Sequence, residues 1–67
     1  MEFDNKKLSQ DVKSKREELQ LSFYGASKQI GCCKATVFRI ENNGYCDLVS
    51  FAKVITWLEV NPNEYFV

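Results

Sequence analysis

Residues 23–42 read FYGASKQIGCCKATVFRIEN, and the fold that we predict rests mainly on this segment. Ser22, immediately before it, is a favoured N-cap residue, so we expect a helix over residues 23–30. Gly31 is free to adopt a positive φ and ends this helix, and a second helix follows over residues 34–42. Two short helices joined by a tight turn that contains glycine form a helix-turn-helix motif.

The apolar and small residues of this stretch agree with the motif. Ser27 is small, as the crossing point of two helices requires, and it lies four residues before the glycine. The positions that should be buried hold Ala26, Ile30, Cys32, Val37 and Ile40. The side chains left outward on the second helix are those of Lys34, Ala35, Phe38 and Arg39. A helix of this kind fits the major groove of DNA with its N-terminal residues at the base edges.

The sequence outside the motif predicts three more helices and no strand. Their expected positions are residues 7–21, 48–58 and 62–66. Their N-cap candidates are Asp4 or Asn5, then Asp47, then Asn61. We therefore predict an all-α fold, a compact five-helix bundle, in a single domain of residues 1–67 whose residues 1–6 are a candidate disordered tail.

The charges balance overall but not along the chain. Nine Lys and Arg match nine Asp and Glu, so the net charge is zero and the chain is not a uniformly basic nucleic-acid binder. Residues 5–43 carry eight bases and four acids, a net charge of +4, whereas residues 44–67 carry one base and three acids. This asymmetry suggests a surface that faces a polyanion.

Several classes of protein are disfavoured by what the sequence lacks. It has no histidine, the commonest general base and metal ligand, and no nucleophile–base pair or phosphate loop. We therefore expect a protein that is not an enzyme, with no cofactor, no metal ion and no small-molecule ligand. Three cysteines are an odd number, and the adjacent Cys32 and Cys33 would pair only with strain, which favours a reduced, cytoplasmic protein. No apolar run is long enough to span a membrane.

Four segments of the chain resemble the XRE family of DNA-binding domains, which includes lambdoid phage repressors and Cro proteins. These segments are residues 12–16, 21–22, Gly31 and residues 36–44. The resemblance continues through residues 51–60 and covers about residues 8–66. It implies a lambda-repressor-like domain that binds operator DNA as a dimer and regulates transcription.

The resemblance also implies roles for individual residues. Arg16 and Glu41 match a structural ion pair that ties the first helix to the end of the recognition helix. The base-facing residues would be Lys34, Ala35, Phe38 and Arg39. The residues near phosphates would be Ser22, Phe23, Thr36, Asn42 and Asn43. Phe23 departs from the pattern, because the family usually has a glutamine there that contacts a phosphate.

Other residues keep alternative interpretations. Phe38 is expected either to touch thymine methyl groups, to bind a protein or to pack inward. Cys33 begins the recognition helix, where a redox role stands beside a plain surface role. The apolar excess near the C-terminus supplies candidates for a dimer interface, with core packing as the alternative for the tryptophan. These candidates are Trp57, Tyr65, Phe66 and Val67.

We expect a sequence-specific DNA-binding transcriptional regulator, specifically a small Cro-like repressor of bacterial or phage origin. Its partner would be double-stranded DNA, and it would be a homodimer at least when bound to that DNA. It would act in the cytoplasm, at the nucleoid, and not at the membrane. The alternative is a protein-interaction module on the same fold, such as an antitoxin or another small regulator. The zero net charge, Phe38 and the missing glutamine favour this alternative.

Overall fold

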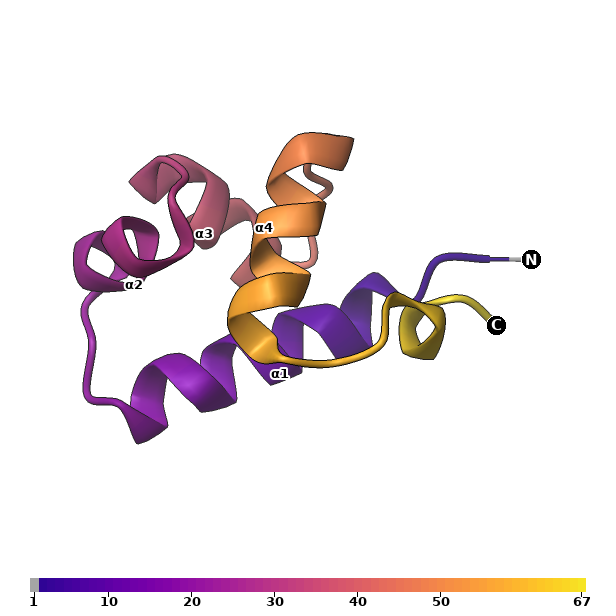
Figure 1. The fold of residues 1–67 in the computed structure, drawn as a ribbon, viewed down its shortest axis with the longest axis horizontal. Coiled ribbons are helices and arrows are strands. Elements are labelled where there is room, and N and C mark those ends of the chain that lie inside the picture. Colours follow the sequence, from indigo (N-terminus) through magenta and orange to yellow (C-terminus); the bar gives the residue numbers. More distant parts are fainter. Residues whose placement is uncertain (1) are drawn as a thin grey trace.

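Four α-helices and one short 3₁₀ helix make up the computed structural model, which describes residues 2–67 (Figure 1). They are α1 (Asn5–Glu18), α2 (Phe23–Ile30), α3 (Lys34–Glu41), α4 (Leu48–Leu58) and the 3₁₀ helix η1 (Pro62–Tyr65). No strand occurs in that part of the chain, and the Cα atoms extend over 32 × 21 × 20 Å. The predicted all-α fold is confirmed, but the fifth predicted helix is a 3₁₀ turn rather than an α-helix. None of the described helices is both long and apolar enough to cross a membrane.

Local capping signals set most of the helix ends. Four N-cap side chains, each at the residue before a helix, accept a hydrogen bond from a backbone N–H in the first turn of that helix. They are Asp4, Ser22, Asp47 and Asn61. Gly31 ends α2 with a φ of 91°, in the left-handed region that glycine adopts without strain. The bounds predicted for α2 and α4 therefore match the observed ones.

The predicted end of α1 was wrong: the helix ends at Glu18, three residues before the expected residue 21. The N–H of Leu21 donates to the carbonyl of Arg16 (2.9 Å), and the N–H of Gln20 donates to that of Glu17 (3.0 Å). This is the hydrogen-bond pattern of a Schellman motif. Gln20 holds the left-handed position with a φ of 56°, where glycine is the usual residue, so the sequence carries no stop signal there.

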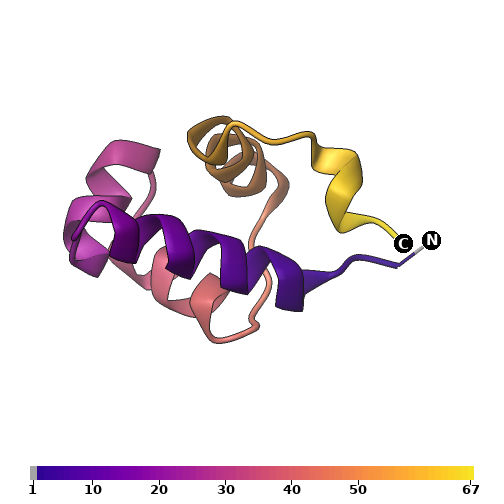
Figure 2. The ribbon, with the colours of Figure 1, turned by 90° about the horizontal axis from the view of Figure 1, so that it is seen from below.

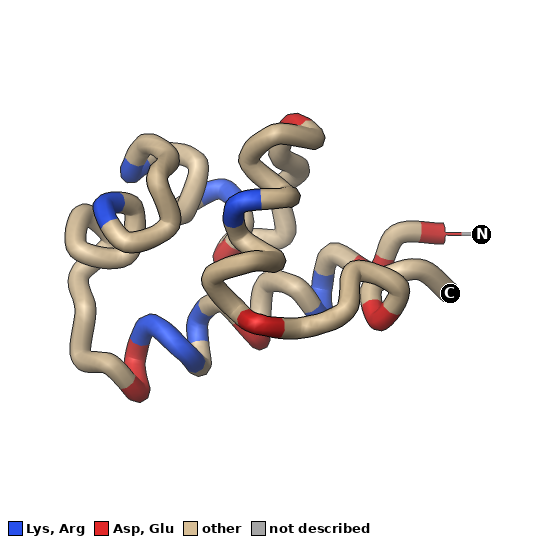
Figure 3. The backbone as a smooth tube through the Cα atoms, viewed as in Figure 1, with Lys and Arg blue, Asp and Glu red and all other residues tan. Residues whose placement is uncertain are grey.

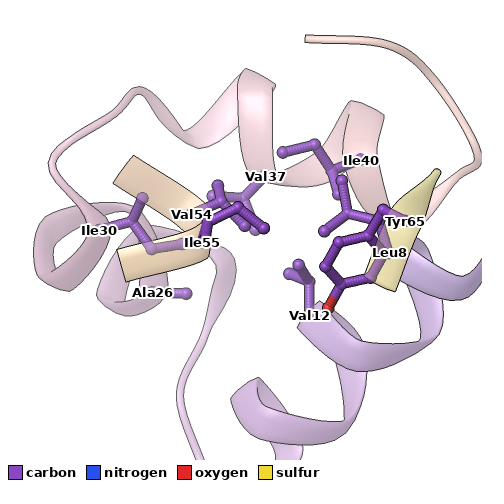
Figure 4. Close-up of a cluster of buried hydrophobic side chains, with 9 residues drawn as sticks. All are labelled: Leu8, Val12, Ala26, Ile30, Val37, Ile40, Val54, Ile55 and Tyr65. Carbon is purple, nitrogen blue, oxygen red and sulfur yellow. The ribbon is translucent and has the colours of Figure 1, made fainter. Parts of the chain in front are cut away.

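The helices meet around one core of nine buried side chains, which Figure 4 shows converging from every element. These side chains belong to Leu8, Val12, Ala26, Ile30, Val37, Ile40, Val54, Ile55 and Tyr65. Four of the five positions expected to be buried in the motif are in this core, and Cys32 packs against it while partly exposed. Ser27 is also buried, as expected for the small residue between helices.

The two ends of the chain lie side by side (Figures 1 and 2). Glu2 and Val67 exchange two backbone hydrogen bonds of 2.7 and 2.8 Å, and the N–H of Asp4 donates to the carbonyl of Tyr65 (2.6 Å). The ring of Phe3 lies 5.5 Å from that of Phe51. Residues 2–6, expected as part of a disordered tail, thus belong to the fold, and Met1 lies outside the described residues. A contact between chain ends leaves no local signal in the sequence.

Tyr65 lies in the core and not on the surface. Its side chain has no exposed area, and its hydroxyl donates a 2.7 Å hydrogen bond to the carboxylate of Asp11. Burial, together with this bond, raises the pKa of the Tyr65 hydroxyl above its ordinary value. Tyr65 is therefore unavailable to a dimer interface, and that prediction is corrected: Tyr65 directly precedes the exposed Phe66 and Val67 in the sequence, but its side chain lies in the core.

Because Tyr65 joins η1 to α1, replacing it should destabilise the whole domain. We expect Tyr65→Ala to lower the free energy of unfolding by about 3–5 kcal/mol, the usual cost of removing a buried aromatic ring. Tyr65→Phe, which loses only the bond to Asp11, should cost about 1 kcal/mol. Thermal and urea unfolding followed by circular dichroism measures both. Tyr24→Ala, at an exposed position of α2, is the control and should change little; equal effects at the two positions would contradict the burial of Tyr65.

Candidate nucleic-acid interface

Helices α2 and α3 are joined by a turn of three residues and packed face to face. The N–H groups of Gly31 and Cys32 both donate to the carbonyl of Ser27 (2.8 and 3.1 Å), which folds the chain back at once. Ala26 on α2 and Val37 on α3 are fully buried, so the inner faces of both helices belong to the core. The outer face of α3 is left at the surface.

That outer face carries the residues predicted to face DNA bases. The four exposed side chains are those of Lys34, Ala35, Phe38 and Arg39. They follow the helical repeat, because Val37 and Ile40 on the opposite side are buried in the core. Phe38 is 53% exposed, so it does not pack inward. The structure thus brings the four predicted residues together on one short helix.

The ring of Phe38 packs against a second aromatic ring. The ring of Phe23, at the start of α2, meets that of Phe38 edge-on at a centroid distance of 5.6 Å. The guanidinium of Arg16 lies over the ring of Phe23 at 4.4 Å. Phe23 is half-buried, and its side chain positions Phe38. Because a phenyl ring has no hydrogen-bond donor, Phe23 cannot donate to a phosphate.

Arg16 and Glu41 form the ion pair expected between α1 and the end of α3. Nε and Nη2 of Arg16 donate to the two carboxylate oxygens of Glu41 at 2.6 and 3.0 Å, a bidentate geometry. Nη1 donates to the carbonyl of Leu21 (3.0 Å), in the connection between α1 and α2. The side chains are 15% and 4% exposed, and the hydrogen bonds to Glu41 raise the pKa of Arg16.

Thr36 departs from the predicted set of residues near phosphates. It is 3% exposed, because it lies on the inner side of α3. Its hydroxyl lies 3.2 Å from the sulfur of Cys33 and accepts a 3.2 Å hydrogen bond from Nη2 of Arg39. This hydroxyl is occupied inside the protein, so the prediction of a phosphate contact for Thr36 is corrected. That role was implied by the family resemblance and not by the helical spacing, which leaves Thr36 out of the exposed set.

The other predicted phosphate residues flank the outer face of α3. Ser22 is exposed, and its hydroxyl accepts from the N–H of Gly25 (3.0 Å) as the cap of α2. Asn42 is exposed and donates through its side chain to the carbonyl of Phe38 (2.8 Å). Asn43 is exposed in the left-handed region with a φ of 63°. These three remain at the surface, where a bound polyanion has access to them.

All charged residues within α2, the turn and α3 are basic, except for Glu41 at the end of α3. Residues 19–40 contain Lys28, Lys34 and Arg39 and no acid, as the blue segments in Figure 3 illustrate. α4 adds another base, because Nζ of Lys53 donates to the carbonyl of Gly31 (3.0 Å) at the turn. Sequence reasoning assigned Lys53 to the acidic third of the chain. Its partner is 22 residues away, so only the fold reveals its place.

The three cysteines differ in their surroundings. Cys33 is exposed, and the hydroxyl of Thr36 lowers the pKa of its thiol by hydrogen bonding. Cys32 and Cys46 are partly buried, and this burial raises the pKa of their thiols. Among residues 2–67 there is no group of three or more Cys, Asp or Glu side chains arranged to hold a metal ion.

The remaining candidates for a dimer interface divide into two kinds. Trp57 is half-buried between α2 and α4, where its indole N–H donates to the side chain of Gln29 (3.0 Å) and the ammonium of Lys15 lies over its ring. This is a packing role within the molecule. Phe66 and Val67 are exposed at the chain end and remain available to a partner.

Comparison of the chain with models of protein families, with curated proteins and with solved structures gives no match. The function is therefore inferred from the residues and the geometry described above. The outer face of α3 offers the most for binding a partner: two basic side chains, a small residue, and an exposed aromatic ring that packs against the ring of Phe23.

The ion pair gives a direct test of how α3 is held. We expect Glu41→Gln to lower the free energy of unfolding by about 2–3 kcal/mol, because it leaves the charge of Arg16 without its partner in a largely buried place. Glu18→Gln, at an exposed position, removes the same charge and should have little effect. Urea unfolding of the three proteins measures the difference. Equal stabilities would mean that Arg16 does not depend on Glu41.

The thiols should also differ in reactivity with pH. Since a lower pKa means more thiolate at neutral pH, Cys33 should react with iodoacetamide faster than Cys32 or Cys46. Thr36→Val should shift the rate profile of Cys33 to higher pH, because the hydrogen bond to the thiolate is lost. Peptide mass spectrometry after timed alkylation gives the rates. An unchanged profile in Thr36→Val would contradict the role of this hydroxyl.

Proposed function

We propose that this chain is a sequence-specific DNA-binding transcriptional regulator, and that α2 and α3 act as a helix-turn-helix of the XRE type. One observation carries the proposal. The outer face of α3 exposes Lys34, Ala35, Phe38 and Arg39 together, while its inner face is fixed in the core. An exposed helix with basic and apolar side chains on one face has the groups that direct readout of the DNA sequence in the major groove requires.

In this proposal α3 lies in the major groove with its exposed face toward the bases of the DNA. Lys34 and Arg39 would donate to O6 and N7 of guanine, and Ala35 and Phe38 would contact thymine methyl groups. The surface residues flanking this face would lie near the phosphates. These residues are Ser22, Asn42 and Asn43.

The proposed mechanism is occlusion of a promoter by a dimer. Two copies would cover half-sites separated by about 34 Å, one turn of the double helix, and so exclude polymerase from the site. This is the action of a small Cro-like repressor of bacterial or phage origin, working at the nucleoid in the cytoplasm. Because the lysine and arginine side chains near α2 and α3 would displace counterions from the DNA, the affinity for DNA should fall steeply with salt concentration.

A second candidate is a protein-interaction module on the same fold, such as an antitoxin. The observation that favours it is Phe38, a large apolar side chain with half of its area exposed, in a chain of zero net charge. The two candidates differ in what Lys34 and Arg39 do. They are central to a DNA contact and incidental to an apolar protein contact.

Substitutions on α3 should separate the two candidates. We expect Lys34→Ala and Arg39→Ala each to weaken binding to a site selected from random DNA by about 1–3 kcal/mol, as loss of a base contact does. Gel shifts at two salt concentrations provide the measurement. Lys13→Ala, which removes an exposed base of α1, is the control and should change affinity much less.

The same assay states what would overturn the DNA-binding proposal. If the folded chain shows no affinity for any selected DNA at low salt, or if Lys34→Ala and Arg39→Ala both bind like the wild type, α3 does not read DNA. The interaction-module candidate then remains. Thermal melting of each variant confirms that the altered affinities do not come from unfolding.

Phe38 provides a test that involves a single methyl group. Replacing thymine by deoxyuridine at one position of the selected site removes only that group. We expect one such replacement to weaken wild-type binding by about fourfold, the value of burying a methyl group, and to leave Phe38→Ala almost unaffected. Phe23→Ala, which removes the ring beneath Phe38, should reduce the discrimination. Equal sensitivity of the wild type and Phe38→Ala at every thymine would contradict the contact.

A further inference from the structure

The side chain of Arg39, one of the two basic residues on the outer face of α3, is bonded to a buried residue of the same helix. Nη2 of Arg39 donates a 3.2 Å hydrogen bond to the hydroxyl oxygen of Thr36, one turn back along α3. Arg39 is exposed, whereas Thr36 is only 3% exposed. A buried hydroxyl therefore holds a guanidinium that stays at the surface.

The hydroxyl of Thr36 has a defined position and a second partner. Thr36 is β-branched, so its side chain has few rotamers in a helix, and the neighbouring Val37 is fully buried in the core. The hydroxyl has one proton. Because Arg39 donates to the oxygen, this proton is left for the sulfur of Cys33, which lies 3.2 Å away. Thr36 is also the main cause that lowers the pKa of the Cys33 thiol, as expected when the sulfur accepts the bond.

The backbone of Arg39 is held as well as its guanidinium. Its carbonyl accepts from the N–H of Asn42 (3.2 Å) and from that of Gly44 (2.7 Å), just after α3 ends. A Cβ atom on residue 44 would lie 2.8 Å from this carbonyl oxygen, so the close approach requires glycine. Both ends of the Arg39 residue are therefore restrained before any ligand binds.

Restraint of this kind favours recognition of one specific group. An arginine loses rotamer freedom when it binds, and part of that cost disappears when the side chain is already placed. A guanidinium has five N–H donors, and Thr36 uses one, so a bidentate contact with O6 and N7 of guanine stays available. We propose that Thr36 is a positioning residue that holds Arg39 in place to read a single guanine.

This inference rests on the proposed function and deepens it. It makes the specificity at one base pair depend on a residue that does not touch DNA. It also differs from the phosphate contact that the resemblance implied for Thr36. Loss of a phosphate contact weakens binding about equally for all sequences, whereas loss of a positioned arginine weakens the discrimination at one guanine.

The test uses the site selected from random DNA and replaces one guanine at a time by 7-deazaguanine, which lacks the N7 acceptor. The guanine read by Arg39 is the one whose replacement weakens the wild type but not Arg39→Ala. At that guanine we expect gel shifts to show about a fivefold loss of affinity for the wild type, from one lost hydrogen bond to a charged group. Thr36→Val, which replaces the hydroxyl by a methyl group, should lose about twofold or less. Thr36→Ser keeps the hydroxyl and should respond like the wild type.

Lys34 provides the matched control on DNA. The hydroxyl of Thr36 bonds to Cys33 and Arg39, so a guanine read by Lys34 should be as sensitive to the replacement in Thr36→Val as in the wild type. An equal weakening of Thr36→Val on every DNA, with wild-type sensitivity at each guanine, would overturn the inference.

Nuclear magnetic resonance of the free protein gives a second readout. The chain has two arginines, so the Nε–H groups give two signals, from Arg16 and Arg39. We expect the ¹⁵N heteronuclear NOE of Arg39 to fall in Thr36→Val and that of Arg16, which is bonded to Glu41, to stay unchanged. An Arg39 signal that is equally mobile in the wild type and in Thr36→Val would also overturn the inference.

The remaining outcomes separate this inference from the proposed function. A wild type whose binding depends on Arg39 but not on Thr36 rejects the inference alone. A folded wild type without affinity for any selected DNA rejects the proposed function and the inference together. Circular dichroism melting shows that each variant is folded, and Thr36→Ala, which also lacks the hydroxyl, takes the place of Thr36→Val if the latter does not fold.

Discussion

The guanidinium of Arg16 is the point on which the placement of α3 depends. It bonds to Glu41 at the end of α3, to the carbonyl of Leu21 before α2, and to the face of Phe23 within α2. Such a pair adds little net stability compared with apolar residues of the same volume, since both charges lose their water. Its value lies in orientation: a bidentate contact has one geometry, and any other placement of α3 would leave a charge stranded. The position of Phe38 follows from this, because Phe23 lies between it and Arg16.

α3 has few means of its own to stay helical. It has eight residues, fewer than an isolated helix needs in water, and Cys33 makes no side-chain cap bond at its start. Its helicity therefore comes from packing, through Val37 and Ile40 in the core and through the ion pair at its end. This separates the two faces of the helix. The inner face carries the stability, and the outer face is free to carry recognition residues at little cost to the fold.

What was predictable from the sequence follows from the range of each signal. The bounds of α2 and α4 were predictable because Ser22, Gly31 and Asp47 act within one turn of their own position. The end of α1 was not, since Gln20 takes a conformation that its residue type does not announce. On α3, helical spacing selected the four exposed residues correctly, whereas the phosphate contact that the family resemblance implied for Thr36 does not fit its buried position. The contact between the two chain ends was not predictable, because its hydrogen bonds and ring contacts join residues more than 40 positions apart.

The zero net charge is less of an obstacle to binding a polyanion than the total suggests. At physiological ionic strength the Debye length is about 8 Å, so exposed charges several such lengths apart act almost independently. The molecule is 32 Å long, with its termini at one end and α2 and α3 toward the other (Figure 1). Acids near the termini are thus largely screened from a ligand on α3, whose neighbourhood over residues 19–40 has three bases and no acid. The charged residues of segment 19–40 are therefore all basic although the total charge of the chain is zero.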